Sequence, residues 1–157
     1  ITFLLAVSSV PLVAEDGGER LKVKNFSSKD ANTSIDAFNK FFYNKETKVY
    51  NASSEKPGRA AIWTQAIYWD MTMNAYLRTR DKKHYEMIEE IYKGACGEYD
   101  NFNWNNTTEW FIYDDIMWWI ISLCRAYEIT GEKKYFELAV SSFDRVWYGL
   151  PGIDDRG

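Results

Sequence analysis

The sequence predicts an all-α fold built from αα-hairpin repeats, on three observations. Apolar residues recur at intervals of three and four in five segments, which is the period of a helix. No segment alternates apolar and polar residues over a length that would indicate a sheet. A pattern of residues also recurs after 51 positions, and we interpret the repeated unit as a helix, a tight turn and a second helix.

The first predicted helix covers residues 31–43, with apolar side chains at Ile35, Phe38, Phe41 and Phe42. Residues 45–59 predict a loop, because they combine Asn and Ser with a Pro-Gly pair. The next two predicted helices, 62–80 and 82–99, form the first hairpin. Asp81 lies between them and has the residue type that caps a helix N-terminus.

The second predicted hairpin follows an Asn-rich, aromatic loop at residues 100–109. Its first helix, 111–130, is apolar almost all round, which is typical of a helix buried on most sides, and it ends at Gly131. Its second helix, 132–148, is more amphipathic and ends before a glycine. Inner and outer helices therefore alternate, which favours a two-layered toroid over a simple bundle.

The repeat itself pairs the segment 75–85 with the segment 126–135. In this alignment His84 is a one-residue insertion beside the turn, so we expect its side chain to be solvated. A single αα-hairpin cannot bury its own apolar face, so hairpins of this kind stack on one another.

Composition narrows the class of protein. The chain has 157 residues and a net charge of -4, so a nucleic-acid partner is not expected. One His cannot supply a His-based metal site or a Ser-His triad, and no metal or organic cofactor is expected. Two cysteines, Cys96 and Cys124, are too few for a disulfide framework, and we expect buried thiols in helices, with a disulfide as the alternative in an exported protein. Aromatic residues reach 17%, a surplus that suits stacking as well as core packing.

Residues 1–14 form an apolar run that is too short to span a bilayer as a helix. The run is similar to the hydrophobic region of a secretory signal peptide, and we expect a partial signal peptide here, followed by a linker or mature N-terminus at 15–30. The alternative is an apolar strand or helix of the fold. A signal peptide predicts an exported protein, in the periplasm, at the cell surface or outside the cell, with no membrane span in the mature chain.

Two adjacent carboxylates, Asp114 and Asp115, stand at the start of the most apolar helix and are the candidate catalytic pair. Acidic residues are favoured in a first helical turn by the helix dipole, so one Asp needs no further explanation. Two adjacent aspartates flanked by Tyr and Trp residues are less favourable. Neighbouring side chains on a helix point about 100° apart, so the two carboxylates cannot both cap the helix equally well. Glycoside cleavage uses such a pair, one carboxylate as nucleophile or base and one as proton donor. From the residues alone, the Asp114–Asp115 pair can be explained either as a catalytic pair or as helix capping.

The repeat interval places Asp114 and Asp115 opposite Trp63 and Thr64 of the preceding inner helix, so Trp63 and Gln65 would lie on the same face as the two acids. An aromatic ring and an amide beside carboxylates suit a polyol. The candidate substrate-binding residues, which all lie at or near the starts of these helices, are Trp63, Gln65, Asn103, Trp104, Trp110 and Tyr113. We expect core packing for Trp69, Trp118, Trp119 and Trp147.

Four segments together resemble glycoside hydrolase family 76, over residues 31–157. They are 62–70 (Ile-Trp-Thr-Gln-Ala-Ile-Tyr-Trp-Asp), 99–104, 110–119 with its Tyr-Asp-Asp, and 125–131 with its downstream helix through Trp147. The resemblance implies an (α/α)6 toroid, of which this chain would hold the N-terminal portion, about five of twelve helices. Such a fragment is expected to be unstable or inactive alone.

The same resemblance implies a monomeric endo-α-1,6-mannanase acting on α-mannan or manno-oligosaccharides by a retaining mechanism. In that mechanism Asp114 would be the nucleophile and Asp115 the general acid/base. Two other functions remain possible. One is a six-hairpin enzyme acting on another glycan, such as one of uronic acids, although the candidate face shows no Arg or Lys for a substrate carboxylate. The other is a glycan-binding or helical-repeat interaction module without turnover.

Overall fold

The computed structural model describes residues 25–55 and 58–150, and the predicted signal peptide at residues 1–14 lies outside them. The described residues form five α-helices, one 3-10 turn and no strand, which confirms the all-α prediction. The helices are α1 (Ser28–Phe42), α2 (Ile62–Thr79), α3 (Lys82–Glu98), α4 (Tyr113–Thr130) and α5 (Lys133–Tyr148), with the 3-10 turn η1 (Asp100–Phe102) before α4.

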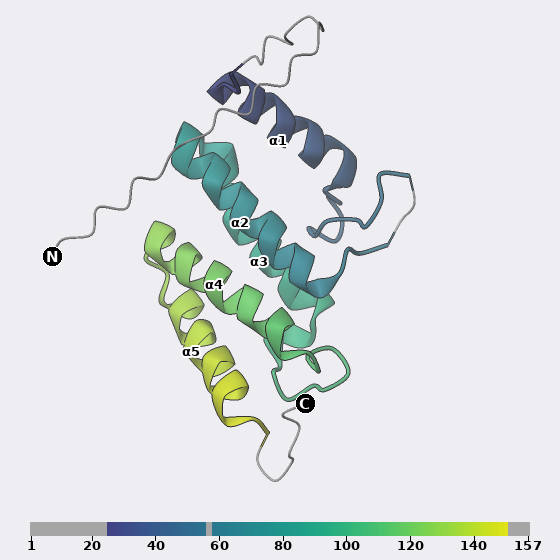
Figure 1. Cartoon of the computed structure of the whole chain (residues 1–157), viewed down its shortest axis with the longest axis vertical. Coiled ribbons are helices and arrows are strands. Elements are labelled where there is room, and N and C mark those ends of the chain that lie inside the picture. The colour runs from purple at the N-terminus through teal and green to yellow at the C-terminus, as the bar shows by residue number, and fades with distance from the viewer. Residues whose placement is uncertain (1–24, 56–57, 151–157) are drawn as a thin grey trace, which may run out of the picture.

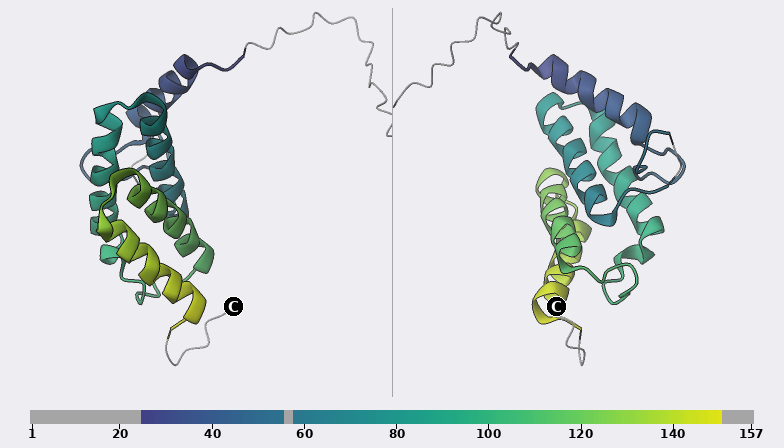
Figure 2. Two further views of the ribbon diagram at one scale, coloured as in Figure 1. Left: turned by 90° about the vertical axis from the view of Figure 1, so that its left-hand side faces the viewer. Right: turned by 45° about the vertical axis from the view of Figure 1, so that its right-hand side comes forward.

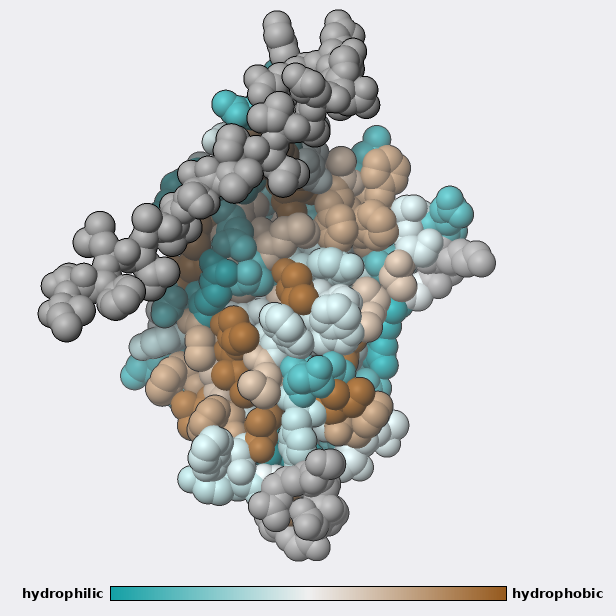
Figure 3. All heavy atoms as spheres, viewed as in Figure 1, coloured by the Kyte–Doolittle hydropathy of each residue, from teal (hydrophilic) through white to brown (hydrophobic). Residues whose placement is uncertain are grey.

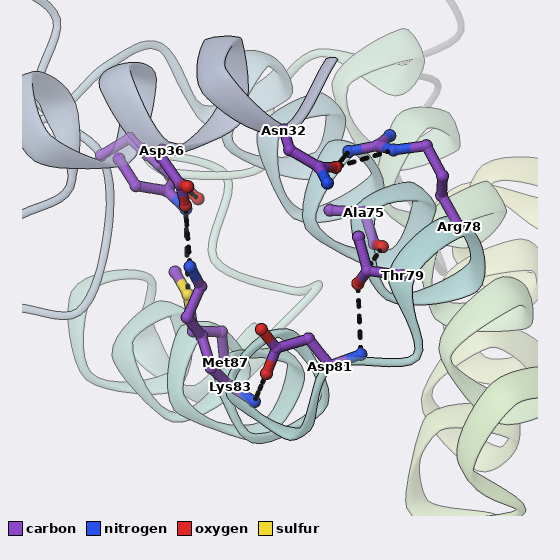
Figure 4. Close-up of polar contacts among 10 residues, drawn as sticks. Asn32, Asp36, Ala75, Arg78, Thr79, Asp81, Lys83 and Met87 are labelled. Atoms are coloured by element: carbon purple, nitrogen blue, oxygen red, sulfur yellow. Dashed lines mark hydrogen bonds and ion pairs between the residues drawn. The ribbon is translucent and has the colours of Figure 1, made fainter. Parts of the chain in front are cut away.

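Helix α1 begins three residues before its predicted start because its N-terminus is a polar capping box. Ser27 accepts a hydrogen bond from the backbone N–H of Asp30, whose carboxylate accepts one from the backbone N–H of Ser27. Its polar face contacts the first hairpin through side-chain pairs, two of which are labelled in Figure 4. Lys83 donates to Asp36 at 2.7 Å, and the guanidinium of Arg78 donates to Asn32 at 2.9 and 3.1 Å.

Two αα-hairpins follow and lie side by side (Figures 1 and 2). Helix α4 packs along α2, where the hydroxyl of Ser122 donates to the carbonyl of Ala66 at 2.9 Å. Helix α5 lies beside α3, where Lys134 and Tyr135 both donate to the Glu89 carboxylate, at 2.6 and 2.7 Å. The inner row is therefore α2 and α4, and the outer row is α3 and α5, as the alternation in the sequence predicts.

The two hairpins share the same threonine hydrogen bonds at their turns. In the first, the hydroxyl of Thr79 donates to the carbonyl of Ala75 and accepts from the backbone N–H of Asp81 (Figure 4). In the second, Thr130 makes the equivalent bonds to Ala126 and from Glu132. Both inner helices end on a left-handed residue, Arg80 with φ 57° and Gly131 with φ 73°.

His84 is not an inserted surface residue, and both of those predictions were wrong. Its backbone N–H donates to Asp81 as that of Tyr135 does to Glu132, so the two residues occupy one repeat position. The same 51-residue offset relates the buried positions of α3 to those of α5 without a gap: His84, Ile88, Ile91 and Gly94 match Tyr135, Ala139, Ser142 and Arg145. His84 is 3% exposed, and its burial lowers the pKa of its imidazole.

Aromatic rings fill the space between the hairpins. Trp69, Trp110 and Trp119 are fully buried and meet Tyr92, Tyr99, Phe102 and Tyr135 with ring centroids 4.9 to 6.3 Å apart. Both cysteines are free thiols, but Cys124 is exposed and Cys96 half-buried, so the prediction of buried thiols was wrong for Cys124. None of the helices in the described part of the chain is long and apolar enough to cross a membrane.

Candidate active site

The two candidate carboxylates lie in the first turn of α4. The helix begins at Tyr113 instead of the predicted residue 111, because Ile112 has extended backbone angles and serves as the N-cap. Ile112 has no side-chain oxygen, so the free N–H groups of this end are not capped by a side chain. Asp114 and Asp115 take the second and third helical positions, where the helix dipole favours negative charge.

Capping does not account for these side chains. Within residues 25–55 and 58–150, neither the Asp114 nor the Asp115 carboxylate accepts a hydrogen bond from a backbone or side-chain donor, whereas the caps of α1 and α3 do so through Ser27 and Asp81. Partial burial of a carboxylate that has no hydrogen-bond partner is unfavourable, so helix capping alone does not explain the placement of Asp115.

The two acids have different environments. Asp115 is 8% exposed, while Asp114 faces solvent. Burial, and in second place the charge of Asp114, raise the pKa of the Asp115 carboxyl above its ordinary value. The two neighbouring carboxyl groups therefore differ in exposure and in the ease with which they hold a proton.

Both carboxylates line one pocket of about 590 Å³ between the N-terminal ends of α2 and α4. Its other lining residues are largely apolar: Ala61, Ile62, Trp63, Ile112 and Trp118. The pocket therefore combines two acids with apolar and aromatic walls, a composition common in small-molecule sites. Of the predicted substrate-binding residues, the structure brings Trp63 to this pocket.

Gln65 lies two residues after Trp63 in α2, but its side chain points into the core. It is fully buried, and its amide pairs with both backbone groups of Tyr50, donating to the carbonyl at 2.7 Å and accepting from the N–H at 2.9 Å. The amide thus ties α2 to the loop that precedes it. Contact of Gln65 with substrate stays a prediction.

Asn103 and Trp104 lie in the loop before α4 and line a different pocket, of about 440 Å³, against the end of α5. The indole of Trp104 is buried and its Nε1 donates to Ser141 at 3.2 Å. The Asn103 side chain is exposed and donates to Asp100 at 3.1 Å. These two residues are therefore not beside the carboxylates, and their contact with substrate stays a prediction.

Trp110 and Tyr113 flank the acids in sequence and contribute to the protein interior. Trp110 is fully buried and stacks on Phe102 with centroids 5.7 Å apart. Tyr113 is half-buried, and its hydroxyl accepts a hydrogen bond from Arg145 at 2.9 Å. Arg145 also donates to the carbonyl of Trp104 at 3.0 Å, so this buried guanidinium ties α5 to both the loop and the start of α4.

Trp118 was expected in the core, and that prediction was wrong. Its side chain is 41% exposed and lines the pocket, whereas the adjacent Trp119 is fully buried. The sequence does hold a signal for this, since Trp118 follows Asp114 by four residues and residues so spaced share a helix face. Trp147, also expected in the core, is exposed on α5.

No group of three or more His, Cys, Asp or Glu side chains that could hold a metal ion occurs among the residues whose positions are described. Asp114 and Asp115 are thus a pair of carboxylates, not part of a larger acidic cluster, in that portion of the chain.

The model of the family described as glycosyl hydrolase family 76 matches residues 27–150, which include all five helices and both carboxylates. No curated protein matches the chain.

Proposed function

Because this chain belongs to glycosyl hydrolase family 76 and is therefore of the glycoside hydrolase class, we propose that it cleaves α-1,6-mannan by a retaining, two-carboxylate mechanism. The observation that carries the mechanism is the unlike pair at the start of α4, in which a buried Asp115 with a raised pKa lies beside a solvent-facing Asp114.

In the proposed first step, the Asp114 carboxylate attacks the anomeric carbon while Asp115 gives its proton to the leaving glycosidic oxygen. The bond from the anomeric carbon to that oxygen breaks, and a glycosyl ester forms on Asp114. In the second step, Asp115, now ionised, takes a proton from water, whose oxygen attacks the anomeric carbon and releases Asp114. The raised pKa of Asp115 supports this order, since a proton donor must hold its proton at the working pH.

Two features support a neutral sugar as substrate. Among the described residues, the lining of the pocket that holds the carboxylates has no Lys or Arg to balance the charge of a uronic acid. Its apolar walls suit the C–H face of a hexose ring. The choice of mannan and of the α-1,6 linkage rests on the family resemblance.

The test is product analysis of the full-length protein on unbranched α-1,6-mannan. We expect manno-oligosaccharides from the wild type and a loss of at least about 10³-fold in rate for Asp114→Asn. Asp115→Asn should lower the rate on mannan by about 10²- to 10⁴-fold, and much less on an aryl mannoside whose leaving group needs no proton.

Glu128→Gln is the matched control, because Glu128 is an exposed acid at the other end of α4. It should leave the rate unchanged. No product from a folded wild type would contradict the mannanase proposal, and product from another α-linked glycan would redirect it to that substrate. Binding without turnover of any glycan would identify a binding module.

A further inference from the structure

Two tryptophans share the pocket with the carboxylates. Trp63 comes from the first turn of α2 and Trp118 from the second turn of α4. Their ring centroids are 6.5 Å apart, with an angle of 38° between the ring planes. The side chains are 40% and 41% exposed, so each indole leaves a large part of its surface open.

Core packing does not account for this exposure. Trp69, Trp110 and Trp119 are fully buried, and the indole N–H of Trp119 donates to the carbonyl of Ile62 at 3.0 Å. The indole N–H of Trp118 has no hydrogen-bond partner among the described residues. A single exposed aromatic residue is unremarkable. Two that meet in a concave site beside paired carboxylates are typical of a surface that binds a ligand.

The position of Trp118 relative to Asp114 is fixed by the helix. Residues four apart lie one above the other on the same face, with Cβ atoms about 5–6 Å apart. The ring of Trp118 therefore lies one turn below the carboxylate of Asp114, on a rigid element and not on a loop. A sugar ring that packs on this indole would have its position set relative to the attacking oxygen.

We infer that Trp63 and Trp118 form an aromatic platform that holds a neutral hexose ring against Asp114 and Asp115, with Trp118 as a substrate-positioning residue. The inference deepens the proposed function and rests on it. The C–H face of the sugar packs on the two indoles, and its hydroxyl edge points to the carboxylates. The Asp114 carboxylate repels an anionic sugar, and the described lining holds no basic residue to offset that repulsion, so a uronic-acid oligosaccharide binds more weakly than a neutral one.

The first test maps the site in the full-length wild type. Tryptophan oxidation by N-bromosuccinimide is followed by peptide mass spectrometry, with and without α-1,6-manno-oligosaccharide, other neutral α-linked oligosaccharides and oligogalacturonate. We expect Trp63 and Trp118 to be oxidised in the free protein and protected by at least one neutral oligosaccharide. Trp147, which is exposed on α5 outside the pocket, should be oxidised in every sample.

The second test measures binding by calorimetry in the Asp114→Asn background, where turnover does not consume the ligand. Trp118→Ala should weaken binding of the protecting oligosaccharide about tenfold, a loss of about 1.4 kcal/mol, and Trp118→Phe should restore most of it. Trp147→Ala is the matched control and should not change the affinity. Near-ultraviolet circular dichroism and the unfolding midpoint of each variant separate a loss of contact from a loss of fold.

Three results would overturn the inference. They are resistance of Trp118 to oxidation in the free protein, lack of protection by every neutral oligosaccharide, and unchanged affinity in Trp118→Ala. Each is independent of the proposed function, because that proposal stands or falls on turnover of mannan by the wild type. A protein that releases manno-oligosaccharides with Trp118 unprotected would keep the mannanase proposal and lose the platform.

Discussion

Asp114 and Asp115 carry the same side chain, but their surroundings give the two carboxyl groups different properties. Helical geometry turns successive side chains by about 100°, which directs Asp115 toward the protein and Asp114 toward solvent. Burial then disfavours the charged form of Asp115, and the charge of Asp114 disfavours it further. A difference in exposure and in proton affinity thus follows from one step along a helix.

The coupling between the two carboxyls gives a prediction about proton binding. Replacing Asp114 by Asn removes a negative charge next to Asp115, so we expect the pKa of Asp115 to fall. Because burial remains, that pKa should stay above the ordinary value of an aspartate. Titration of the carboxyl carbon of Asp115 by ¹³C NMR measures both effects.

Glu128→Gln serves as the control for that titration, since it removes an equal charge from the far end of the same helix. It should leave the pKa of Asp115 where it is. An Asp115 pKa that does not move in Asp114→Asn would mean that the two carboxyls do not interact.

Residue types near the acids predicted the site only in part. Trp63 reaches the pocket, but Gln65, Trp104 and Trp110 are buried in contacts with Tyr50, Ser141 and Phe102. The sequence cannot separate an indole that packs inward from one that lines a pocket, because both satisfy the same helical spacing. Trp118 and Trp119 show this, since they are adjacent and of one type, yet one is exposed and the other fully buried.

At the scale of the elements, the hairpin turn tolerates different residues because a few threonine hydrogen bonds fix its geometry. Arg80 and Gly131 end the two inner helices in the same left-handed conformation, although only glycine adopts it without strain. The threonine bonds on either side, at Thr79 and Thr130, are the same in both hairpins. The alignment by residue type paired Tyr85 with Tyr135 because both are tyrosines. The residue that occupies the position of Tyr135 in the first hairpin is His84, so the alignment introduced a false insertion.

The loop before α2 is held against α3 at one glycine, which gives a prediction about stability. A Cβ on Gly94 would come within 2.6 Å of the backbone oxygens of Thr47 and Lys48. Gly94→Ala therefore forces the loop or the helix to shift, and we expect a loss of about 1–3 kcal/mol in the free energy of unfolding, measured with urea.

Gly97, three residues later on α3, is the matched control. A Cβ there meets nothing within 4 Å, so Gly97→Ala should raise the free energy of unfolding by about 0.5–1 kcal/mol through helix propensity alone. Equal effects of the two substitutions would show that the loop does not pack on α3 as described.

For the whole molecule, the stacking of hairpins leaves one face of the last hairpin open. Its outer helix α5 exposes an apolar stripe at helical spacing, and Figure 3 shows apolar side chains gathered over α4 and α5. The stripe is Phe136, Val140, Phe143 and Trp147. By the 51-residue repeat it matches the face of α3 that packs on α5, which includes Glu89 and Tyr92. Such a face suits a further hairpin in the same register, as in a helical toroid.

The open stripe predicts how residues 1–157 behave when expressed alone. Phe143 stacks on Trp147 at the surface, with centroids 5.9 Å apart, and we expect this face to drive concentration-dependent self-association. Phe143→Lys should reduce the association at least about tenfold, because a desolvated ammonium opposes burial of the face. Sedimentation velocity over a range of concentrations measures the change.

Ala37→Lys adds the same charge to an exposed position on α1 and is the control for net charge. It should leave the association as it is in the wild type. If Phe143→Lys associates as strongly as the wild type does, the stripe is not a contact surface. The monomeric state expected from the sequence requires this face to be covered.

The sequence by itself determined the helices, the hairpin repeat and the carboxylate pair, since periodicity, capping residues and adjacent acids are local features. Helix ends agree within three residues, and the family resemblance matches the family model. Only the tertiary structure decided which aromatic side chains line the pocket, that Gln65 and His84 are buried, and that Asp115 is much less exposed than Asp114. Those properties depend on which segment covers which face, and the covering residues are distant in the chain, as for Trp119, whose indole donates to the carbonyl of Ile62, 57 positions away.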